Sequence, residues 1–244
     1  MTGFAGKRYW LVGASEGLGA ALAARLSAEG ADLVLSARNR DRLEQLAENL
    51  PGQAGVVTMD VRDDDSVAQA VQEAGDVDGI VFLAGVYWPM SAKQWDLDHG
   101  VAMADVNFTG AFRVLGRVVP RMVERDAGHV VITGSLSGFR GLPGAVGYGA
   151  SKAGVMSLAQ TLRADLWRTG VRVQLANPGF IKTRLTDKND FHMPFLMSPE
   201  RAADEMMALM RSKTAFDRHF PRLFSLVFRL SRVLPNWAYY RLFA

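Results

Sequence analysis

A tyrosine and a lysine four residues apart, Tyr148 and Lys152 in "YGASK", have the right types and spacing for proton transfer. If this stretch is helical, the two residues lie on one face, so the phenol and the ammonium can point into the same cleft. The unperturbed pKa of tyrosine is about 10, too high for a base at neutral pH, but a neighbouring ammonium stabilises phenolate. Such a pair on its own is most often two exposed residues of a helix. The catalytic interpretation therefore needs other chemical groups around it.

A glycine-rich stretch near the start, "VGASEGLGAALA", predicts a phosphate-binding turn. It places Gly13, Gly17 and Gly19 at the spacing G-x-x-x-G-x-G, with Ser15 between the first two. Glycine suits a tight turn that a phosphate approaches closely, and the helix that follows presents unpaired N–H groups. Three glycines alone can mark an ordinary turn. Here a strand before the turn, an alanine-rich helix after it and a second strand at "ADLVLSA" complete a βαβ unit, which predicts dinucleotide binding.

The end of the second predicted strand bears on the choice of dinucleotide. An acidic residue there usually meets a free ribose 2′-OH, whereas an arginine accommodates a 2′-phosphate. This chain has Arg38 in "LSARNR" and no acid, which favours NADP(H) over NAD(H). Glu16 in the glycine turn argues the other way because a carboxylate repels phosphate, and Arg38 can also be an ordinary loop residue. Asp60 and Val61 end the third predicted strand, where they either border the adenine or belong to the capping region of a helix.

Alternating strand and helix patterns would position these groups. Six apolar runs are predicted as strands: "RYWLVG", "ADLVLSA", "AGVVTMD", "GIVFLAG", "GHVVITG" and "VRVQLANPG". Helical patterns lie between them, including residues 66–74, 98–124 and 148–168. This order predicts an α/β fold, a Rossmann-type doubly wound parallel sheet with helices on both faces. The ligand of such a sheet binds beyond the carboxyl ends of the strands, where the motifs above fall.

Length and composition fit a single globular domain. The 244 residues are 49% hydrophobic and 22% charged, and they include no cysteine, which excludes disulfides, thiolate catalysis and cysteine-bound metals. We assign residues 1–198 to a cofactor-binding and catalytic core and residues 199–244 to a C-terminal helical extension of the same domain. No apolar stretch of signal length is seen at the start, so a cytoplasmic location is expected. No metal is expected either, because no metal-ligand spacing relates the four histidines, His99, His129, His192 and His219.

From residue 6 to about 200 the sequence resembles a short-chain dehydrogenase/reductase of the roughly 250-residue type. The glycine turn matches, and the family's catalytic Asn, Ser, Tyr and Lys correspond to Asn107 in "VNFTGAF", Ser135 in "VITGSLSG", Tyr148 and Lys152. Thirteen residues separate the serine from the tyrosine, as the family pattern requires.

Two further segments bear on the resemblance. The "NPGFIKT" stretch matches the family's segment after the sixth strand, which implies that the nicotinamide is flanked by Pro178, Gly179, Ile181 and Thr183. The fourth strand departs from the pattern, because Phe82 and Leu83 stand where the family usually has two asparagines. The Ala84 and Gly85 that follow are retained, and they let the backbone approach the cofactor.

The resemblance implies hydride transfer between a nicotinamide and the carbon of a ketone or secondary alcohol. In the reducing direction Tyr148 would donate a proton to the substrate oxygen and Ser135 would hydrogen-bond that oxygen. Lys152 would lower the pKa of Tyr148 and hold the nicotinamide ribose, and Asn107 would position a water that links Lys152 to solvent. Ser137 is the alternative for the role of the serine. We therefore expect an NADP(H)-dependent carbonyl reductase or alcohol dehydrogenase, the alternatives being a noncatalytic dinucleotide sensor or scaffold, or a lyase or epimerase of the same fold.

The segment "TRLTDKNDFHMPFLMSPE", after the sixth strand, is long enough to form a lid over a substrate. Its apolar side chains either favour an apolar, lipid-like ketone or alcohol or only dock the lid on the fold; they are Phe191, Met193, Phe195, Leu196 and Met197. Tyr87, Trp88 and His192 are weaker candidates for substrate contact. Ser198 followed by Pro199 predicts the start of another helix.

The end of the chain is basic and amphipathic. Residues 211–244 hold seven Arg and Lys against one Asp. One face of a predicted helix carries Leu223, Leu226, Val227, Leu230, Val233 and Leu234, and another face carries Arg222, Ser225, Arg229 and Arg232. This stretch is too short to span a bilayer. The main expectation is that it packs on its own domain or across a dimer; the alternative is contact with a membrane surface, with Trp237, Tyr239 and Tyr240 at headgroup depth.

Expected partners follow from these assignments. They are a small apolar carbonyl or alcohol substrate and further copies of this chain, because the resemblance implies a homodimer or homotetramer packed through the helices at 98–124 and 148–168. Nucleic-acid binding is not expected, since no nucleic-acid-binding fold accompanies the basic residues.

Overall fold

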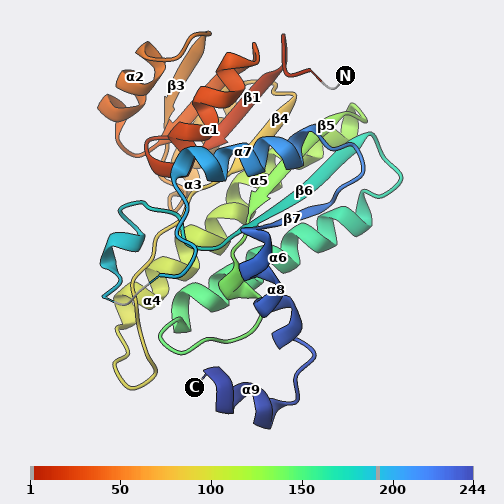
Figure 1. The fold of residues 1–244 in the computed structure, drawn as a ribbon. Coiled ribbons are helices and arrows are strands. Elements are labelled where there is room, and N and C mark those ends of the chain that lie inside the picture. The colour runs from red at the N-terminus through yellow and green to blue at the C-terminus, as the bar shows by residue number, and fades with distance from the viewer. Residues whose placement is uncertain (1–2, 191–192, 244) are drawn as a thin grey trace.

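The computed structural model describes residues 3–190 and 193–243, which form a parallel sheet between two layers of helices (Figure 1). Within the described chain the sheet has seven strands in the order β3-β2-β1-β4-β5-β6-β7, and every neighbouring pair is parallel. The strands are β1 (Arg8–Val12), β2 (Asp32–Ala37), β3 (Ala54–Thr58), β4 (Gly79–Phe82), β5 (Gly128–Thr133), β6 (Val171–Pro178) and β7 (Asp217–Phe220).

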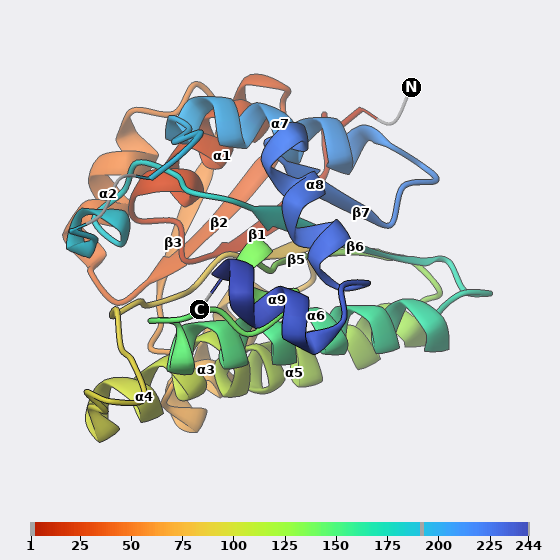
Figure 2. The same cartoon turned by 60° about the horizontal axis from the view of Figure 1, so that its bottom comes forward.

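Helices cover both faces of the sheet, as Figure 2 shows most clearly. One face carries α1 (Gly17–Ala28), α2 (Arg40–Glu48) and α7 (Pro199–Arg211), and the other carries α3 (Asp64–Ala74), α4 (Leu97–Ala104), α5 (Gly110–Glu124) and α6 (Val146–Asp165). Two helices near the C-terminus, α8 (Arg222–Ser231) and α9 (Asn236–Phe243), lie outside these layers and project from the body (Figure 1). The predicted doubly wound α/β fold is confirmed.

The apolar strand sequences follow from this double covering. Along β1, Trp10 and Val12 belong to the core beneath α3, α5 and α6, while Tyr9 and Leu11 belong to the core beneath α1 and α7. A strand buried on both faces has no polar alternation, so it reads as a continuous apolar run. Helices α2, α3 and α7 begin at side chains that accept a hydrogen bond from a backbone N–H of the first turn, which are Asn39, Asp63 and Ser198.

Four features differ from the sequence prediction. The prediction had six strands and missed β7, whose sequence "DRHF" is short and polar because it lies at the edge of the sheet and pairs only with β6. The helix expected over 98–124 is α4 and α5 joined by a π-helical turn, Asp105–Thr109. The helix expected over 148–168 begins earlier, at Val146, so Tyr148 lies in its first turn. The single C-terminal helix is two helices, α8 and α9. The division of the chain at residue 198 stays a prediction.

Candidate active site

The glycine turn between β1 and α1 is built so that backbone approaches backbone. Gly13 has φ 95° and Gly17 has φ 55°, values that side-chain-bearing residues rarely adopt. A Cβ added to Gly13 would lie 2.6 Å from the backbone nitrogen of Ala84, and one added to Gly19 would lie 2.2 Å from the carbonyl oxygen of Gly13. The turn therefore exposes main-chain N–H groups at the start of α1, where an anion is stabilised by the helix dipole.

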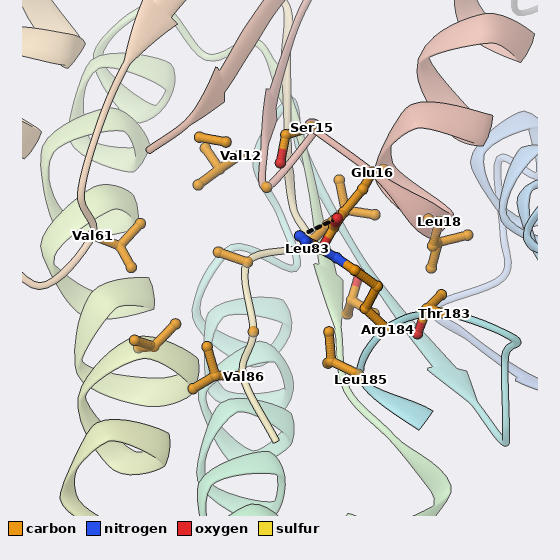
Figure 3. Close-up of a pocket in the computed structure, with 18 of the residues that line it drawn as sticks. Val12, Ser15, Glu16, Leu18, Val61, Leu83, Val86, Thr183, Arg184 and Leu185 are labelled. Atoms are coloured by element: carbon orange, nitrogen blue, oxygen red, sulfur yellow. Dashed lines mark ion pairs between the residues drawn. The ribbon is translucent and has the colours of Figure 1, made fainter. Parts of the chain in front are cut away.

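A cavity of about 690 Å³ lies over this turn, at the carboxyl ends of the strands. Figure 3 shows its labelled side chains, which come from the glycine turn, the ends of β3 and β4 and the segment after β6. Every residue that we predicted to bind the cofactor lines it: Gly13, Ser15, Gly17, Gly19, Arg38, Asp60, Val61, Ala84, Gly85, Tyr148, Lys152, Pro178, Gly179, Ile181 and Thr183. Their binding roles stay predictions, but the fold brings them to one place.

Charged side chains gather at the end of the cavity nearest α2. The Glu16 carboxylate, which sequence reasoning treated as repelling phosphate, pairs with Arg42 at 3.0 Å and also with Arg184, the pair drawn as a dashed line in Figure 3. Arg38 is exposed and lines the same end of the cavity. Because Glu16 faces two arginines, its negative charge is offset within the cluster.

The strand-end residues beside Arg38 have structural partners. Asp60 pairs with Arg62 at 2.7 Å, and this hydrogen bond, above all, holds the pKa of Asp60 below its usual range. The helix-capping role considered for the acidic cluster from Asp60 to Asp65 is filled by Asp63, which caps α3. Ser36 is buried and accepts a hydrogen bond from the indole nitrogen of Trp10 at 2.8 Å, which ties β2 to β1.

Tyr148 and Lys152 stand one turn apart at the start of α6 and both reach the cavity. The Lys152 ammonium lies 5.7 Å from the centre of the Tyr148 ring and donates a hydrogen bond to the carbonyl oxygen of Thr133 at 3.0 Å. Burial lowers the pKa of Lys152 to about 8 and raises the pKa of Tyr148 to about 12, while a hydrogen bond with Ser135 acts to lower the latter. Burial is therefore the largest influence on the pKa of Tyr148. The lowering of that pKa by Lys152 stays a prediction.

Ser135 lies directly after β5, at the start of a short 3₁₀ turn, Leu136–Gly138. Its hydroxyl lies 2.9 Å from the hydroxyl of Ser137 and accepts a hydrogen bond from the Ser137 backbone N–H. The serine whose hydrogen bond acts on the Tyr148 phenol is Ser135. This geometry favours Ser135 over Ser137 for the role beside the tyrosine.

Asn107 is buried in the π-helical turn between α4 and α5. Its side-chain oxygen accepts from the backbone N–H of Val86 at 2.7 Å, and its side-chain nitrogen donates to the Val86 carbonyl and to the Ser151 hydroxyl, both at 3.0 Å. The Asn107 side chain thus fastens the loop after β4 to α6. Its part in a water link to Lys152 stays a prediction.

Aromatic side chains surround the substrate side of Tyr148. The Tyr87 ring meets the Tyr148 ring edge to face at 5.0 Å, and the Tyr87 hydroxyl donates to Asn189 in the predicted lid at 2.8 Å. Lys188 in the same lid donates to the Tyr87 carbonyl and lies 4.1 Å above the Trp88 ring. Tyr87 and Trp88, weak candidates from sequence, are therefore the residues against which the lid is held.

Among the apolar lid residues, one is buried against the fold and another is exposed beside α8. Met197 is buried and docks the lid on the fold, whereas Phe195 is exposed and lies 5.6 Å from the ring of Phe224 in α8. Phe180, which precedes the lid, lies 5.8 Å from the same ring. Phe191 and His192, which the sequence offered as lid and substrate contacts, lie outside the described residues.

Sequence reasoning missed Arg42, Arg184 and the carbonyl of Thr133 as parts of this site. Arg42 lies four residues after Arg38, a spacing that would place both near the same strand end. Arg184 follows the matched "NPGFIKT" segment directly. Among the described residues no group of three or more His, Asp or Glu side chains is placed to hold a metal ion.

Comparisons with known proteins agree with this geometry. A sequence model of short chain dehydrogenases matches residues 7–193. An uncharacterized oxidoreductase of Myxococcus xanthus is 38% identical over 234 residues, 93% of this chain and 92% of that protein. A 3-oxoacyl-(acyl-carrier-protein) reductase of Thermotoga maritima is 34% identical over 195 residues, 75% of this chain and 77% of the relative.

Solved structures share the fold. A short chain dehydrogenase/reductase family protein superposes with a TM-score of 0.82 at 30% identity, covering 89% of this chain and 97% of the other. A short-chain dehydrogenase from Sphingobium yanoikuyae in complex with NADPH superposes with a TM-score of 0.81 at 24% identity, covering 94% and 97%. At that identity the second likeness concerns the fold alone.

Proposed function

The chain belongs to the short-chain dehydrogenase/reductase family of nicotinamide-dependent oxidoreductases, and from that membership we propose that it is an NADP(H)-dependent reductase of an apolar ketone. The observation that carries the proposal is the position of the Tyr148 phenol, which lines the cavity together with Lys152 and is hydrogen-bonded to Ser135. A protonated phenol suits the donation of a proton to a carbonyl oxygen, so the reducing direction is proposed as the one that the site favours.

The residues present fit a nicotinamide dinucleotide. The glycine turn leaves no room for a Cβ at Gly13 or Gly19, and the cavity volume of about 690 Å³ lies within the range of cofactor sites. The N–H groups at the start of α1 would hold the pyrophosphate, and Pro178, Gly179, Ile181 and Thr183 would flank the nicotinamide. When bound, the cofactor supplies the hydride.

The preference for NADP(H) rests on charge. Arg38 and Arg42 both line the cavity near the end of β2, where a ribose 2′-phosphate would lie, and no acidic residue follows that strand directly. Glu16 faces Arg42 and Arg184 and is therefore offset rather than free to repel a phosphate. An Arg–phosphate contact is charge-assisted and stronger than a neutral hydrogen bond.

The chain's own residues then have defined parts in the reaction. Tyr148 donates its proton to the substrate oxygen, and Ser135 hydrogen-bonds that oxygen as negative charge develops on it. Lys152, fixed by the Thr133 carbonyl, supplies a positive charge that favours the phenolate left behind. Asn107 holds the loop after β4 against α6, which keeps Gly85 and Lys152 in place.

An apolar substrate is supported by aromatic side chains at two places on the cavity. Tyr87 from the β4 loop packs against Tyr148. Phe224 from α8 lies against Gly179, which lines the cavity, and its ring contacts Phe180 and Phe195. The Thermotoga maritima relative carries a name that specifies reduction of a 3-oxoacyl chain, which is a ketone on an acyl group. We propose a ketone with an acyl or similarly apolar body as the substrate class.

Assembly and location are part of the proposal. A homodimer or homotetramer is supported by large apolar side chains left exposed on α4 and α5, among them Val101, Phe112 and Val123. A cytoplasmic location is proposed, together with contact of the C-terminal helices with a membrane surface. No helix in the described part of the chain is long and apolar enough to cross a bilayer.

A panel of apolar ketones tested with NADPH and NADH, followed by the loss of reduced-cofactor absorbance, tests the function directly. We expect turnover with at least one ketone, faster with NADPH. The matched variant is Tyr148→Phe, which keeps the ring and removes the proton. It should lose roughly 10²-fold or more in kcat while binding NADPH as before, measured by cofactor fluorescence. Turnover that survives in Tyr148→Phe would contradict the mechanism, and the absence of NADPH binding by the unaltered protein would contradict the cofactor assignment.

A further inference from the structure

Helix α8 is turned with its apolar face toward solvent. Leu223 is 68% exposed, Leu230 is 56% exposed and Val233, just past the helix, is 79% exposed, and Leu226 and Val227 are exposed beside them. Positions three and four apart share a helix face, so these five residues form one continuous stripe. The side chains of α8 that are buried are Ser225 and Ser231. A surface helix normally buries its apolar stripe, and this one does the reverse.

Helix α9 extends the same kind of surface. Trp237 is 74% exposed, and Tyr240 and Leu242 are also exposed, while Tyr239 is buried against the body. We call the eight exposed apolar residues of the two helices the outer face: Leu223, Leu226, Val227, Leu230, Val233, Trp237, Tyr240 and Leu242. In Figure 1 both helices project beyond the sheet and its covering layers. An apolar surface of this kind marks a site of contact.

The outward orientation is fixed by contacts on the inner side. The Arg140 guanidinium, from the loop between Ser135 and Tyr148, donates to the Leu234 carbonyl at 2.8 Å and to the Asn236 side chain at 2.6 Å, and it also donates to the Ser231 carbonyl. The same guanidinium lies 4.0 Å above the centre of the Tyr239 ring, and the Tyr239 hydroxyl donates to the Gly141 carbonyl. Both helices are therefore anchored to the catalytic loop, and the outer face is held away from the body.

The charge around the outer face is of one sign. From residue 218 to residue 243 the chain carries Arg218, Arg222, Arg229, Arg232 and Arg241 and no acidic residue. Arg222, Arg229 and Arg241 are exposed, and among the described residues their side chains make no hydrogen bond or ion pair. The pKa of Asp217 in β7 is lowered chiefly by its hydrogen bond with His219, and the charge of Arg229 contributes to this lowering. On α8 the arginines flank one edge of the leucine stripe, because Arg222 and Arg229 are seven residues apart.

This positive charge distinguishes between two candidates for binding the outer face, a second copy of the chain and a lipid surface. In a symmetric dimer a surface patch meets its own copy, so the arginines of one chain would approach those of the other. Anionic lipid headgroups complement the same arginines, and acyl chains take up the leucines. We infer that the outer face docks on the surface of an anionic lipid bilayer.

The helices lie in the plane of the interface when docked. Helix α8 has ten residues, far short of the roughly 20 that span a bilayer, so only its apolar stripe enters the boundary between headgroups and acyl chains. Trp237 and Tyr240 sit at headgroup depth, where amphipathic rings are favoured. The arginines flanking the stripe reach the headgroups.

Docking in this orientation brings the substrate side of the site next to the lipid. The inner side of α8 carries Phe224, whose ring meets Phe180, just before the lid, and Phe195 of the lid. A Cβ added to Gly179, beside the proposed nicotinamide position, would lie 3.1 Å from the Phe224 ring. This step rests on the proposed function: a ketone dissolved in the bilayer would reach Tyr148 past Phe224 without crossing water.

Sedimentation of the full chain with vesicles tests the docking. We expect the protein to sediment with vesicles that contain phosphatidylglycerol, to bind phosphatidylcholine vesicles at least tenfold more weakly, and to be released by salt. Trp237→Glu and Leu230→Glu should each weaken binding at least tenfold. The matched control is Trp167→Glu, which changes a tryptophan that is 65% exposed in the turn after α6 and should leave binding unchanged.

Failure to sediment with phosphatidylglycerol vesicles overturns the inference, as does unchanged binding by both outer-face variants. If those variants still bound the vesicles but had a lower molecular mass in solution than the unaltered protein, the outer face would be assigned to contact with a second copy of the chain. Both variants should bind NADPH and reduce a water-soluble ketone at the unaltered rate, which shows that they are folded. Because that assay contains no lipid, its outcome tests the proposed function separately from the docking.

Discussion

The cofactor cavity and the α8–α9 pair are two surfaces of the same chain that differ in what they expose, backbone groups in the first and apolar side chains in the second. At the glycine turn of the cavity the main chain comes to the surface, because Gly13 and Gly19 leave no space for side chains. At α8 and α9 the main chain is satisfied within the helices, and leucine and tryptophan side chains face outward. The first surface is a cavity of defined shape, and we propose a dinucleotide as its ligand. The second is a broad apolar face ringed by arginines, which suits a fluid partner with no fixed shape.

The two surfaces are also anchored to different parts of the fold. The cavity is fixed by strand ends in the middle of the sheet, whereas α8 and α9 depend on the loop between Ser135 and Tyr148. Changes at the cavity should therefore act on cofactor binding and chemistry together. Changes at α8 and α9 should act on substrate access and leave cofactor binding intact.

The largest effect is expected from Lys152→Met. Removing the ammonium beside Tyr148 should lower kcat for ketone reduction by roughly 10² to 10⁴. The same change should stabilise the fold by about 1 to 3 kcal/mol at pH 7, because it relieves the cost of burying a charge. Single-turnover kinetics and thermal unfolding measure the two effects. If Lys152→Met were as active as the unaltered protein and no more stable, Lys152 would have no part in the reaction.

The stability of the unaltered protein should depend on pH because Lys152 is buried. Burial lowers the pKa of Lys152 to about 8 from an unfolded value of 10.5. Below pH 8 the folded protein carries the full cost of the buried ammonium, and between about pH 8 and 10.5 it releases the proton before the unfolded chain does. The contribution of Lys152 to the free energy of unfolding should therefore rise with pH across this window, and in Lys152→Met that rise should be absent.

A smaller loss is expected from Gly19→Ala. The added Cβ would lie 2.2 Å from the Gly13 carbonyl oxygen, so the turn must shift and the dissociation constant for NADPH should rise about tenfold or more. Gly116→Ala is the matched control, since a Cβ at this position in α5 meets nothing within 4 Å. The control should bind NADPH normally and be slightly more stable. Equal NADPH affinity in the two variants would refute a close backbone approach at the turn.

Cofactor preference should respond to Arg38→Asp. Replacing the cation near the end of β2 with a carboxylate should lower the ratio of kcat/KM for NADPH to that for NADH by about tenfold, the value of one charge-assisted contact. Glu16→Gln should shift the ratio the opposite way, because it frees Arg42 and Arg184 from their common partner. Opposite signs in the two variants are the expected result. The same sign in both would mean that neither side chain acts through the 2′-phosphate.

The smallest effect at the site is expected from Arg140→Gln. This change removes the guanidinium contacts to α8 and α9, so the melting temperature should fall by a few degrees and KM for an apolar ketone should rise several-fold. The dissociation constant for NADPH should stay unchanged, as titration of cofactor fluorescence would show. A weakened NADPH affinity would mean that the contacts of α8 and α9 also affect the cofactor cavity, contrary to the expectation that the two surfaces are independent.

Strands β1 to β6, the glycine turn and the positions that line the cavity could be predicted from the sequence alone. These features are local, because a βαβ unit and glycine conformational freedom are written in short stretches, and parallel strands place all their carboxyl ends at one edge. For the same reason Tyr148 and Lys152 were assignable from a spacing of four within one helix. The edge strand β7 escaped prediction because four polar residues at a sheet edge carry no apolar pattern.

The way in which distant side chains neutralise or orient one another is seen only in the folded structure. Glu16 and Arg184 are 168 positions apart, so their pairing could not be read from either segment. The pKa of Tyr148 depends on desolvation by everything packed around it, and burial is its largest influence. The amphipathic pattern of α8 was visible in the sequence, but the side facing solvent was set by Arg140 and Tyr239 on the inner surface. A helix records which residues share a face, and only its packing partners determine which face is buried.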